Sequence, residues 1–326
     1  MILRRCLLAA CAALLLAAQP LLARQHPSQN TAQEAPASQT PQAHFNVSVH
    51  LVNVFVNVTG PHGQPVPSLT KDDFSLSQDG IPQKIAYFER QTNMPLSIVL
   101  AIDTSGSVYI DHTIEISAAR DFIHALMRPA DQLELIDFNS TVDEIVPFTS
   151  NIKRIDRGLD RLTHGPATAL YNAIWLASRR LGTRHGRKIL VIISDGGNTV
   201  SGIDYPEALH QALRDQTMIY SIIDVPVIAD AGRDTGGEHA LISLSQGTGG
   251  QYYYAEYGHL SDAFQQLSQD LRTQYLISYY PLPHRTESDF RHIHIELRPG
   301  AVPNPSQDTL RYRPGYFAPP SPPLDR

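Results

Sequence analysis

Five oxygen-bearing side chains in this sequence have the types and the spacing that suit metal chemistry. They are Asp103, Ser105, Ser107, Thr168 and Asp195. The first three follow the apolar run 96–102, the last follows the apolar run 189–194, and Thr168 stands near the start of a predicted helix. Because ligands of open α/β sheets bind at the carboxyl ends of the strands, we expect these side chains to lie close together there. Carboxylate and hydroxyl oxygens, without His or Cys, suit Mg²⁺, with Ca²⁺ or Mn²⁺ as alternatives.

The composition of this ligand set indicates what else the ion would bind. Most of the donors are neutral hydroxyls, so they would leave part of the charge of a divalent ion unneutralised. Such an ion would accept one more carboxylate from another molecule. The sequence therefore predicts a protein partner that presents Asp or Glu to the metal. The structural alternative is that Asp103 and Ser105 only cap the helix that follows them.

The elements that must position these residues alternate between strand and helix from residue 92 to 273. Apolar runs predict strands at 96–102, 133–138, 144–148, 189–194, 218–223 and 251–254. Apolar residues at helical spacing predict helices near 116–126, 152–162, 170–181, 206–215, 240–245 and 260–271. This order predicts an α/β domain with a doubly wound, mostly parallel, Rossmann-like sheet.

Short β segments flank this α/β block on both sides. Strands are expected at 45–58, 74–77, 85–88, 275–280, 291–297 and 310–313. In the first of them, one face carries Phe45, Val47, Val49 and Leu51. After a shift at Val52–Asn53 the alternation continues with Val54, Val56 and Val58, which is compatible with a bulge. Because exposed sheet edges are a hazard, residues 44–91 and 274–318 are expected to pair into one small all-β sandwich, with residues 92–273 inserted in it.

The amino-terminal segment has the pattern of an export signal. Residues 1–23 combine Arg4 and Arg5 with a short apolar run, which predicts a cleaved signal peptide and a secreted or periplasmic protein without a membrane span. The apolar run before Cys11 is too short for a lipoprotein signal. Residues 24–43 are rich in Gln, Pro, Ala and Ser and predict a flexible linker, and residues 319–326 form a Pro-rich tail.

The composition narrows the classes of function. The 326 residues allow one large domain or two ordinary ones, and the net charge of −6 disfavours a nucleic-acid binder. Both cysteines lie in the predicted signal peptide, so thiol catalysis, thiolate metal sites and disulfides are excluded from the mature chain.

The motif Asp-x-Ser-x-Ser, an isolated Thr and a later Ser-Asp-Gly resemble the metal-ion-dependent adhesion site of von Willebrand factor type A (VWA) domains. Over about residues 45–318, the chain also resembles an exported bacterial group called VWFA-related, known best from acidobacteria. Four further motifs carry that likeness, namely Asp72-Asp73-Phe74-Ser75-Leu76, Asp79-Gly80, Thr248-Gly249-Gly250 and Tyr312-Arg313-Pro314-Gly315-Tyr316.

The resemblance implies a role for each candidate ligand. Ser105 and Ser107 would bind the metal directly, Thr168 would bind it when a partner is present, and Asp103 and Asp195 would act mainly through water. The sequence departs from the family in having Gly-Pro-Ala-Thr where many members have Gly-x-Thr. Thr163 is therefore an alternative to Thr168.

Three functions follow from these observations. The first is an exported, non-enzymatic, metal-dependent protein-binding module. The second is a Mg²⁺-dependent hydrolase, which would need a general base near the metal, and Asp137, Asp224 and Asp230 stand near predicted strand ends. The third is a structural envelope protein whose site has no function.

Two further clusters invite weaker interpretations. His292 and His294 would share one face of a strand, but a zinc site needs a third ligand, so solvated histidines are the preferred interpretation. Five cations gather at a helix end, where they suit the helix dipole, and docking of an acidic partner is the alternative. They are Arg179, Arg180, Arg184, Arg187 and Lys188.

Overall fold

The computed structural model describes residues 51–61, 63–90, 93–106, 112–225, 234–256, 260–281, 290–302 and 309–318. The chain divides into two units, Met1–Val47 and Ser48–Arg326, and all described residues belong to the second. The predicted signal peptide, linker and tail lie outside the described residues, as do Ser107 and Asp230. Within the described ranges, no helix is long and apolar enough to cross a membrane.

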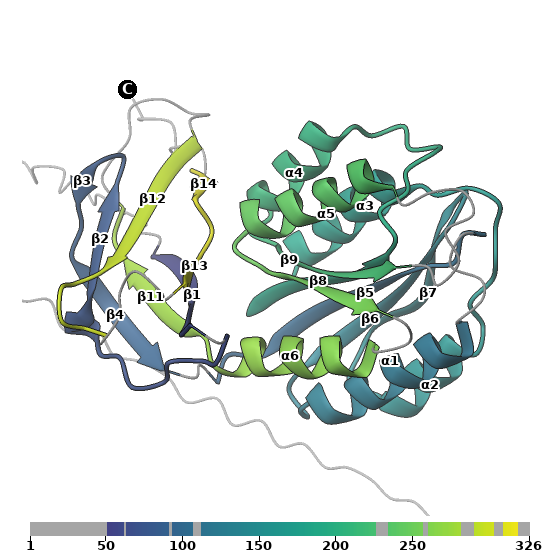
Figure 1. The fold of residues 1–326 in the computed structure, drawn as a ribbon, viewed down its shortest axis with the longest axis horizontal. Coiled ribbons are helices and arrows are strands. Elements are labelled where there is room, and N and C mark those ends of the chain that lie inside the picture. The colour runs from purple at the N-terminus through teal and green to yellow at the C-terminus, as the bar shows by residue number, and fades with distance from the viewer. Residues whose placement is uncertain are drawn as a thin grey trace, which may run out of the picture. The chain divides into compact units, whose positions relative to one another are not determined.

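A six-stranded sheet forms the centre of the α/β part, in the order β10-β9-β8-β5-β6-β7 (Figure 1). Its strands are β5 (Leu96–Asp103), β6 (Gln132–Phe138), β7 (Val142–Thr149), β8 (Arg187–Ser194), β9 (Met218–Val225) and β10 (Tyr252–Glu256). Neighbouring strands are parallel except for β6 and β7, which run antiparallel. The fold-class prediction of a mostly parallel α/β sheet is confirmed.

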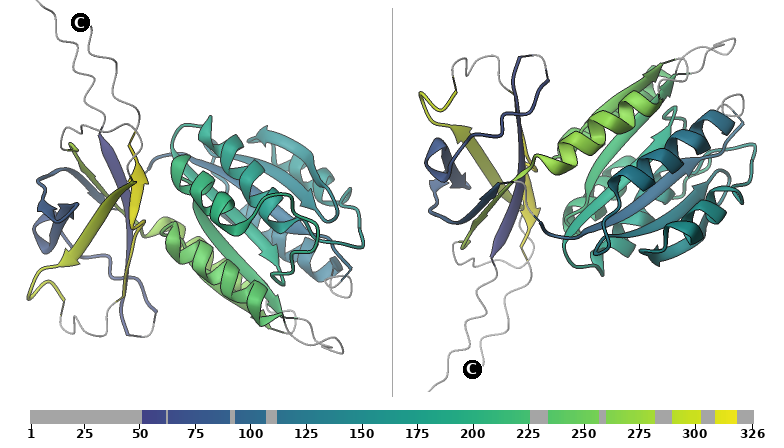
Figure 2. Two further views of the ribbon diagram at one scale, coloured as in Figure 1. Left: turned by 90° about the horizontal axis from the view of Figure 1, so that it is seen from above. Right: turned by 90° about the horizontal axis from the view of Figure 1, so that it is seen from below.

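Helices cover both faces of this sheet (Figures 1 and 2). The helices on one face are α1 (His112–Leu126), α2 (Ile152–Leu159) and α6 (Leu260–Arg272). Those on the other face are α3 (Leu170–Gly182), α4 (Tyr205–Arg214) and α5 (Thr235–Gly247). Strands between two helical layers have no solvated face, which explains why the central runs are apolar at every position and do not alternate.

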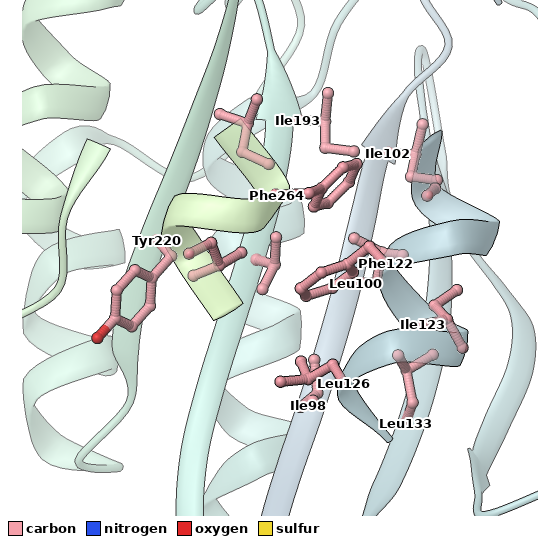
Figure 3. Close-up of a cluster of buried hydrophobic side chains, with 14 of the residues drawn as sticks. Ile98, Leu100, Ile102, Phe122, Ile123, Leu126, Leu133, Ile193, Tyr220 and Phe264 are labelled. Carbon is pink, nitrogen blue, oxygen red and sulfur yellow. The ribbon is translucent and has the colours of Figure 1, made fainter. Parts of the chain in front are cut away.

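The central strand β5 shows this double burial most clearly. Its residues Ile98, Leu100 and Ile102 point toward α1 and α6, while the residues between them pack under α3 and its neighbours (Figure 3). On the face of β5 that α1 and α6 cover, the rings of Phe122 and Phe264 stack with centroids 4.4 Å apart. Every residue of β5 is buried, so the strand end that carries Asp103 is fixed by packing on both faces.

The flanking segments form two four-stranded sheets, in the orders β13-β1-β11-β4 and β14-β12-β2-β3. The strands are β1 (Val52–Thr59), β2 (Phe74–Gln78), β3 (Ile81–Pro82), β4 (Ile85–Arg90), β11 (Tyr275–Tyr279), β12 (Phe290–Leu297), β13 (Thr309–Arg311) and β14 (Gly315–Phe317), with one 3₁₀ turn at Lys71–Asp73. Each sheet combines strands from before and after the α/β part, since β1 pairs with β11 and β2 with β12. One apolar core joins the two sheets, as expected for a sandwich.

Three element predictions need correction. In β1, Val52 is buried on the same face as Val54, Val56 and Val58, so the predicted shift at Val52–Asn53 is wrong. Residues 45–50 of the predicted strand lie outside the described residues. Helix α2 ends at Leu159 and not at residue 162, and the Asp137 carboxylate accepts a hydrogen bond from the Thr163 N–H, 2.8 Å away.

Helix α5 is longer than the predicted 240–245. It begins after Asp234, whose side chain accepts a hydrogen bond from the Gly237 N–H at 2.9 Å. A capping carboxylate stabilises a first turn that contains two glycines of low helix propensity. Because glycines add no apolar residue to the helical spacing, the sequence did not predict this turn.

A buried polar cluster ties α6 to strands of both parts. Asp270 accepts hydrogen bonds from Arg311 of β13 and from the Tyr253 hydroxyl of β10, each at 2.7 Å. All three side chains are largely buried, and Asp270 is 7% exposed. The ion pair is thus a specific link between the last strands and the α/β core.

Candidate metal centre

The first loop of the candidate centre begins where β5 ends. Asp103 is 1% exposed and its two carboxylate oxygens have different donors. The Ser194 hydroxyl donates to Oδ2 at 2.6 Å, and the Ser105 backbone N–H donates to Oδ1 at 2.9 Å. Asp103 therefore links the loop after β5 to the end of β8. These two strands are direct neighbours in the sheet.

The second loop, after β8, orients Asp195. The Gly197 N–H donates to Asp195 Oδ1 at 2.9 Å, and the Gly196 N–H donates to the Ser194 hydroxyl at 3.0 Å. Gly196 has a φ of +93° and packs against the backbone of Gly237, so a side chain there would be strained and would collide. The tight turn that aims the Asp195 carboxylate depends on this glycine.

Thr168 faces the same space as Asp195. Its hydroxyl oxygen and Asp195 Oδ1 both lie within 4 Å of the point that a Cβ atom on Gly197 would occupy. Thr168 is 4% exposed, and its backbone N–H donates to the Thr199 hydroxyl at 2.9 Å while its carbonyl accepts from the Thr199 N–H at 2.9 Å. These reciprocal bonds hold Thr168 beside the loop that carries Asp195.

Thr163, the alternative to Thr168, has a different partner. Its hydroxyl donates to Asp137 Oδ2 at 3.2 Å, and its backbone N–H donates to the same oxygen at 2.8 Å. The Thr104 hydroxyl donates to the other oxygen of Asp137. The geometry thus places Thr168 near Asp195 and gives Thr163 a supporting role.

Hydrogen bonds also join the Thr168 loop to the first loop. The Gly165 N–H donates to the Thr104 carbonyl at 3.1 Å, and Ser105 forms a parallel bridge with Gly165. Asn139 donates from its side chain to the Thr104 hydroxyl at 3.0 Å and to the Thr163 carbonyl at 2.9 Å. The sequence predicted no part in this centre for Thr104 or Asn139, because only folding brings these loops together.

The electrostatics of the centre favour a cation. Burial raises the pKa of Asp103 to about 6, against hydrogen bonds from Ser194 and Ser105 that lower it, and the nearby charge of Asp195 raises it further. No Lys, Arg or His in the described ranges forms an ion pair with Asp103. Buried carboxylates are normally paired or bound to metal.

The donor chemistry fits a hard divalent ion. Asp103, Ser105, Thr168 and Asp195 offer carboxylate and hydroxyl oxygens, which suit Mg²⁺ better than Zn²⁺. In the described part of the chain, no group of three or more His, Cys, Asp or Glu side chains is placed to hold a metal. Hydroxyl ligands would therefore have to complete the shell, as the sequence motif predicts.

The two weaker clusters have other partners. His294 is exposed and bonds Glu296 at 2.9 Å. Arg180 of the basic cluster forms ion pairs with Glu134 and Glu144. The Arg184 guanidinium lies 4.6 Å from the centroid of an aromatic ring of β7. These cations are engaged with the protein's own groups, which leaves little of the predicted cluster for a partner.

Comparison with known proteins matches the region that carries the candidate centre. The family model of the von Willebrand factor type A domain matches residues 98–198, a range that contains all four described candidate ligands. A search of curated proteins found no match.

Solved structures with a similar fold include three bacterial surface or membrane proteins. An aerotolerance-related membrane protein from Bacteroides fragilis is 19% identical, with a TM-score of 0.43, over 54% of this chain and 98% of that one. The vWF domain of the pili tip protein Mfa5 from Porphyromonas gingivalis is 12% identical, with a TM-score of 0.43, over 55% of this chain and 95% of that one. The pilus adhesin SpaC from Lactobacillus rhamnosus is 11% identical, with a TM-score of 0.46, over 76% of this chain and 48% of that one.

Proposed function

We propose that this chain is an exported, metal-dependent protein-binding module of the adhesion type, because residues 98–198 match the family model of the von Willebrand factor type A domain. The observation that supports the proposal is the placement of Asp103 and Asp195 at the ends of β5 and β8, with the Thr168 hydroxyl beside Asp195 and, among the described residues, no ion pair from Asp103 to a protein cation. The export part of the proposal rests on the pattern of residues 1–23.

Mg²⁺ at this centre would supply an electrophile for one carboxylate oxygen of a partner protein. Ser105, Ser107 and Thr168 would bind the ion through hydroxyl oxygens, and Asp103 and Asp195 would hold its water ligands. Hydroxyl ligands add no negative charge, so the ion keeps its attraction for an Asp or Glu side chain of the partner.

We propose no catalytic role for the centre. A hydrolase would need a general base within hydrogen-bond reach of the reacting water. Asp137, one of the acids that the sequence offers as that base, already accepts hydrogen bonds from Thr104 on one oxygen and from Thr163 on the other. We therefore assign its carboxylate to the support of the loops.

The metal part of the proposal is tested by thermal melting with Mg²⁺ or with chelator. A ligand that binds only the folded state raises stability with concentration, so the wild type is expected to melt higher in Mg²⁺. Asp103→Ala and Thr168→Ala should lose that shift. Thr163→Ala is the matched control, which should melt lower than the wild type but keep the shift. A wild type that gains nothing from Mg²⁺, Ca²⁺ or Mn²⁺ would refute the proposal.

The partner part is tested with a displayed library of random peptides, bound in Mg²⁺ and eluted with chelator. We expect the eluted peptides to be enriched in Asp and Glu, and we expect no enrichment on the Asp103→Ala bait. Equal enrichment on both baits, or eluted peptides without acidic residues, would contradict recognition through the metal.

A further inference from the structure

A hollow on the surface lies between α2 and the edge strand β7. It has a volume of about 400 Å³ and is lined by Ile145, Arg154, Arg157 and Arg161. The three arginines are exposed, and they lie three and four residues apart, so they share one side of α2 and of the turn that follows it.

Among the described residues, no carboxylate neutralises these three charges. Arg161 donates to the Ile145 carbonyl at 2.7 Å and Arg157 donates to the Lys153 carbonyl at 3.2 Å, and carbonyl acceptors orient a guanidinium without cancelling its charge. In the described ranges, Arg154, Arg157 and Arg161 form no ion pair.

The acids of the same helix face another way. Asp160 accepts from Arg120 of α1 at 2.7 Å, and Asp156 bonds His124 of α1 at 3.1 Å. The charges of α2 are thus sorted, with acids bound to α1 and three unneutralised arginines along β7. The chain has a net charge of −6, so this positively charged surface differs in sign from the protein as a whole and attracts anions locally.

The chemistry of the hollow favours carboxylates. A guanidinium has five donors in a planar fork that matches a carboxylate, and here each arginine uses at most one side-chain donor within the protein. The row of charges extends along a helix and its turn, so it suits a segment with several acids better than a single ion.

The hollow is connected to the candidate metal centre by a short loop. Arg161 stands two residues before Thr163 and seven before Thr168. Seven residues span at most about 25 Å even when fully extended, so the two sites are within reach of one short peptide.

We propose that the hollow of Arg154, Arg157 and Arg161 binds an acidic segment of the same partner protein whose Asp or Glu reaches the metal centre. The assignment of both contacts to one partner rests on the proposed function. The binding of an acidic peptide to the arginines does not depend on the metal.

The test uses a labelled poly-L-glutamate peptide in chelator at low ionic strength, with anisotropy as the readout. The wild type should bind it, and Arg154→Glu with Arg157→Glu should weaken binding roughly tenfold or more, because two attractions become repulsions. The matched control reverses Arg179 and Arg214, two exposed arginines on other helices, and should weaken binding far less. A double Arg→Gln variant replaces the Glu variant if circular dichroism shows that the latter is unfolded.

Three outcomes would overturn the inference. They are no binding by the wild type, equal weakening by the control pair, and tighter binding of inorganic polyphosphate or dextran sulfate than of poly-L-glutamate at equal charge. Asp103→Ala should bind poly-L-glutamate as the wild type does. If Mg²⁺ does not stabilise the wild type, the proposed function is refuted but the binding of acidic peptides to the arginine hollow is not. If the wild type does not bind poly-L-glutamate, this inference is refuted but the proposed function is not.

Discussion

Asp103→Asn gives the sharpest prediction about the candidate centre, because the metal-free protein should become more stable when a proposed ligand is removed. Asp103 is buried and its pKa stands at about 6, against an ordinary value of 3.8, chiefly through burial. A carboxyl whose pKa is raised on folding stabilises the folded state at low pH and loses that contribution as the pH rises through the folded pKa. At pH 7 the loss amounts to about 3 kcal/mol.

Asparagine resembles the protonated acid at this position. Asp103 receives hydrogen bonds from Ser194 and Ser105, and either a protonated carboxyl or an amide keeps one acceptor oxygen for the Ser105 N–H and turns one donor toward the Ser194 hydroxyl, which can also accept. We therefore expect Asp103→Asn and the wild type to be similarly stable near pH 4 in chelator. Between pH 4 and 7 the variant should gain an advantage that reaches on the order of 1–3 kcal/mol.

Urea unfolding across this pH range, with chelator present, measures the advantage directly. Repeating it in Mg²⁺ should reverse the order, because saturation to 1,000 times Kd adds about 4.1 kcal/mol to the wild type and nothing to the variant. A variant that is less stable than the wild type in chelator at pH 7 would refute the reasoning, since it would show that the Asp103 charge is already compensated within the protein.

Two further predictions concern the β part and its link to the core. Burial raises the pKa of Asp79, but hydrogen bonds from a backbone N–H and from Arg291 lower it by more, so Asp79→Asn should cost about 1 kcal/mol at pH 7 and progressively less as the pH falls below about 4. Because Asp79 has a φ of +51°, where Asn is tolerated, the loss in urea unfolding reports on charge and not on the backbone. Asp270→Ala should cost about 3–5 kcal/mol in the same assay, since it leaves Arg311 and the Tyr253 hydroxyl buried without their partner. Asp270→Asn should cost less because its amide oxygen still accepts from Tyr253, and a loss below about 1 kcal/mol in Asp270→Ala would contradict the role of the pair.

The sequence predicted the parts of the fold that depend on burial alone. The run 96–102 is apolar at every position, and β5 is buried at every position. The apolar run 96–102 ends at Asp103 and the run 189–194 ends at Ser194. These two ends were sufficient to predict which two loops would meet, because adjacent parallel strands end at the same edge of a sheet.

The supporting contacts of the centre were not predictable in this way. The bonds from Thr104 and Thr163 to Asp137 join residues 26 to 33 positions apart, and no local pattern specifies them. For the same reason the predicted end of α2 at residue 162 was wrong, because the N–H of Thr163 donates to the Asp137 side chain of β6 and not to a carbonyl of the helix. The spacing of the three arginines on α2 and the turn after it is visible in the sequence, but the pairing of Asp156 and Asp160 with α1 is not.

An acidic chain that recognises an acidic partner needs local positive charge, and the two sites would supply it by different physics. A metal binds one carboxylate directly at short range, so its contribution depends on chelator and only weakly on salt. Exposed arginines act through solvent, so their contribution falls as ionic strength rises and the Debye length shortens to about 8 Å at physiological salt. If both sites bind one partner, raising the salt should remove the contribution of Arg154 and Arg157 and leave the part that depends on Asp103. Affinity that falls to the chelated level with salt alone would mean that the metal adds nothing to recognition.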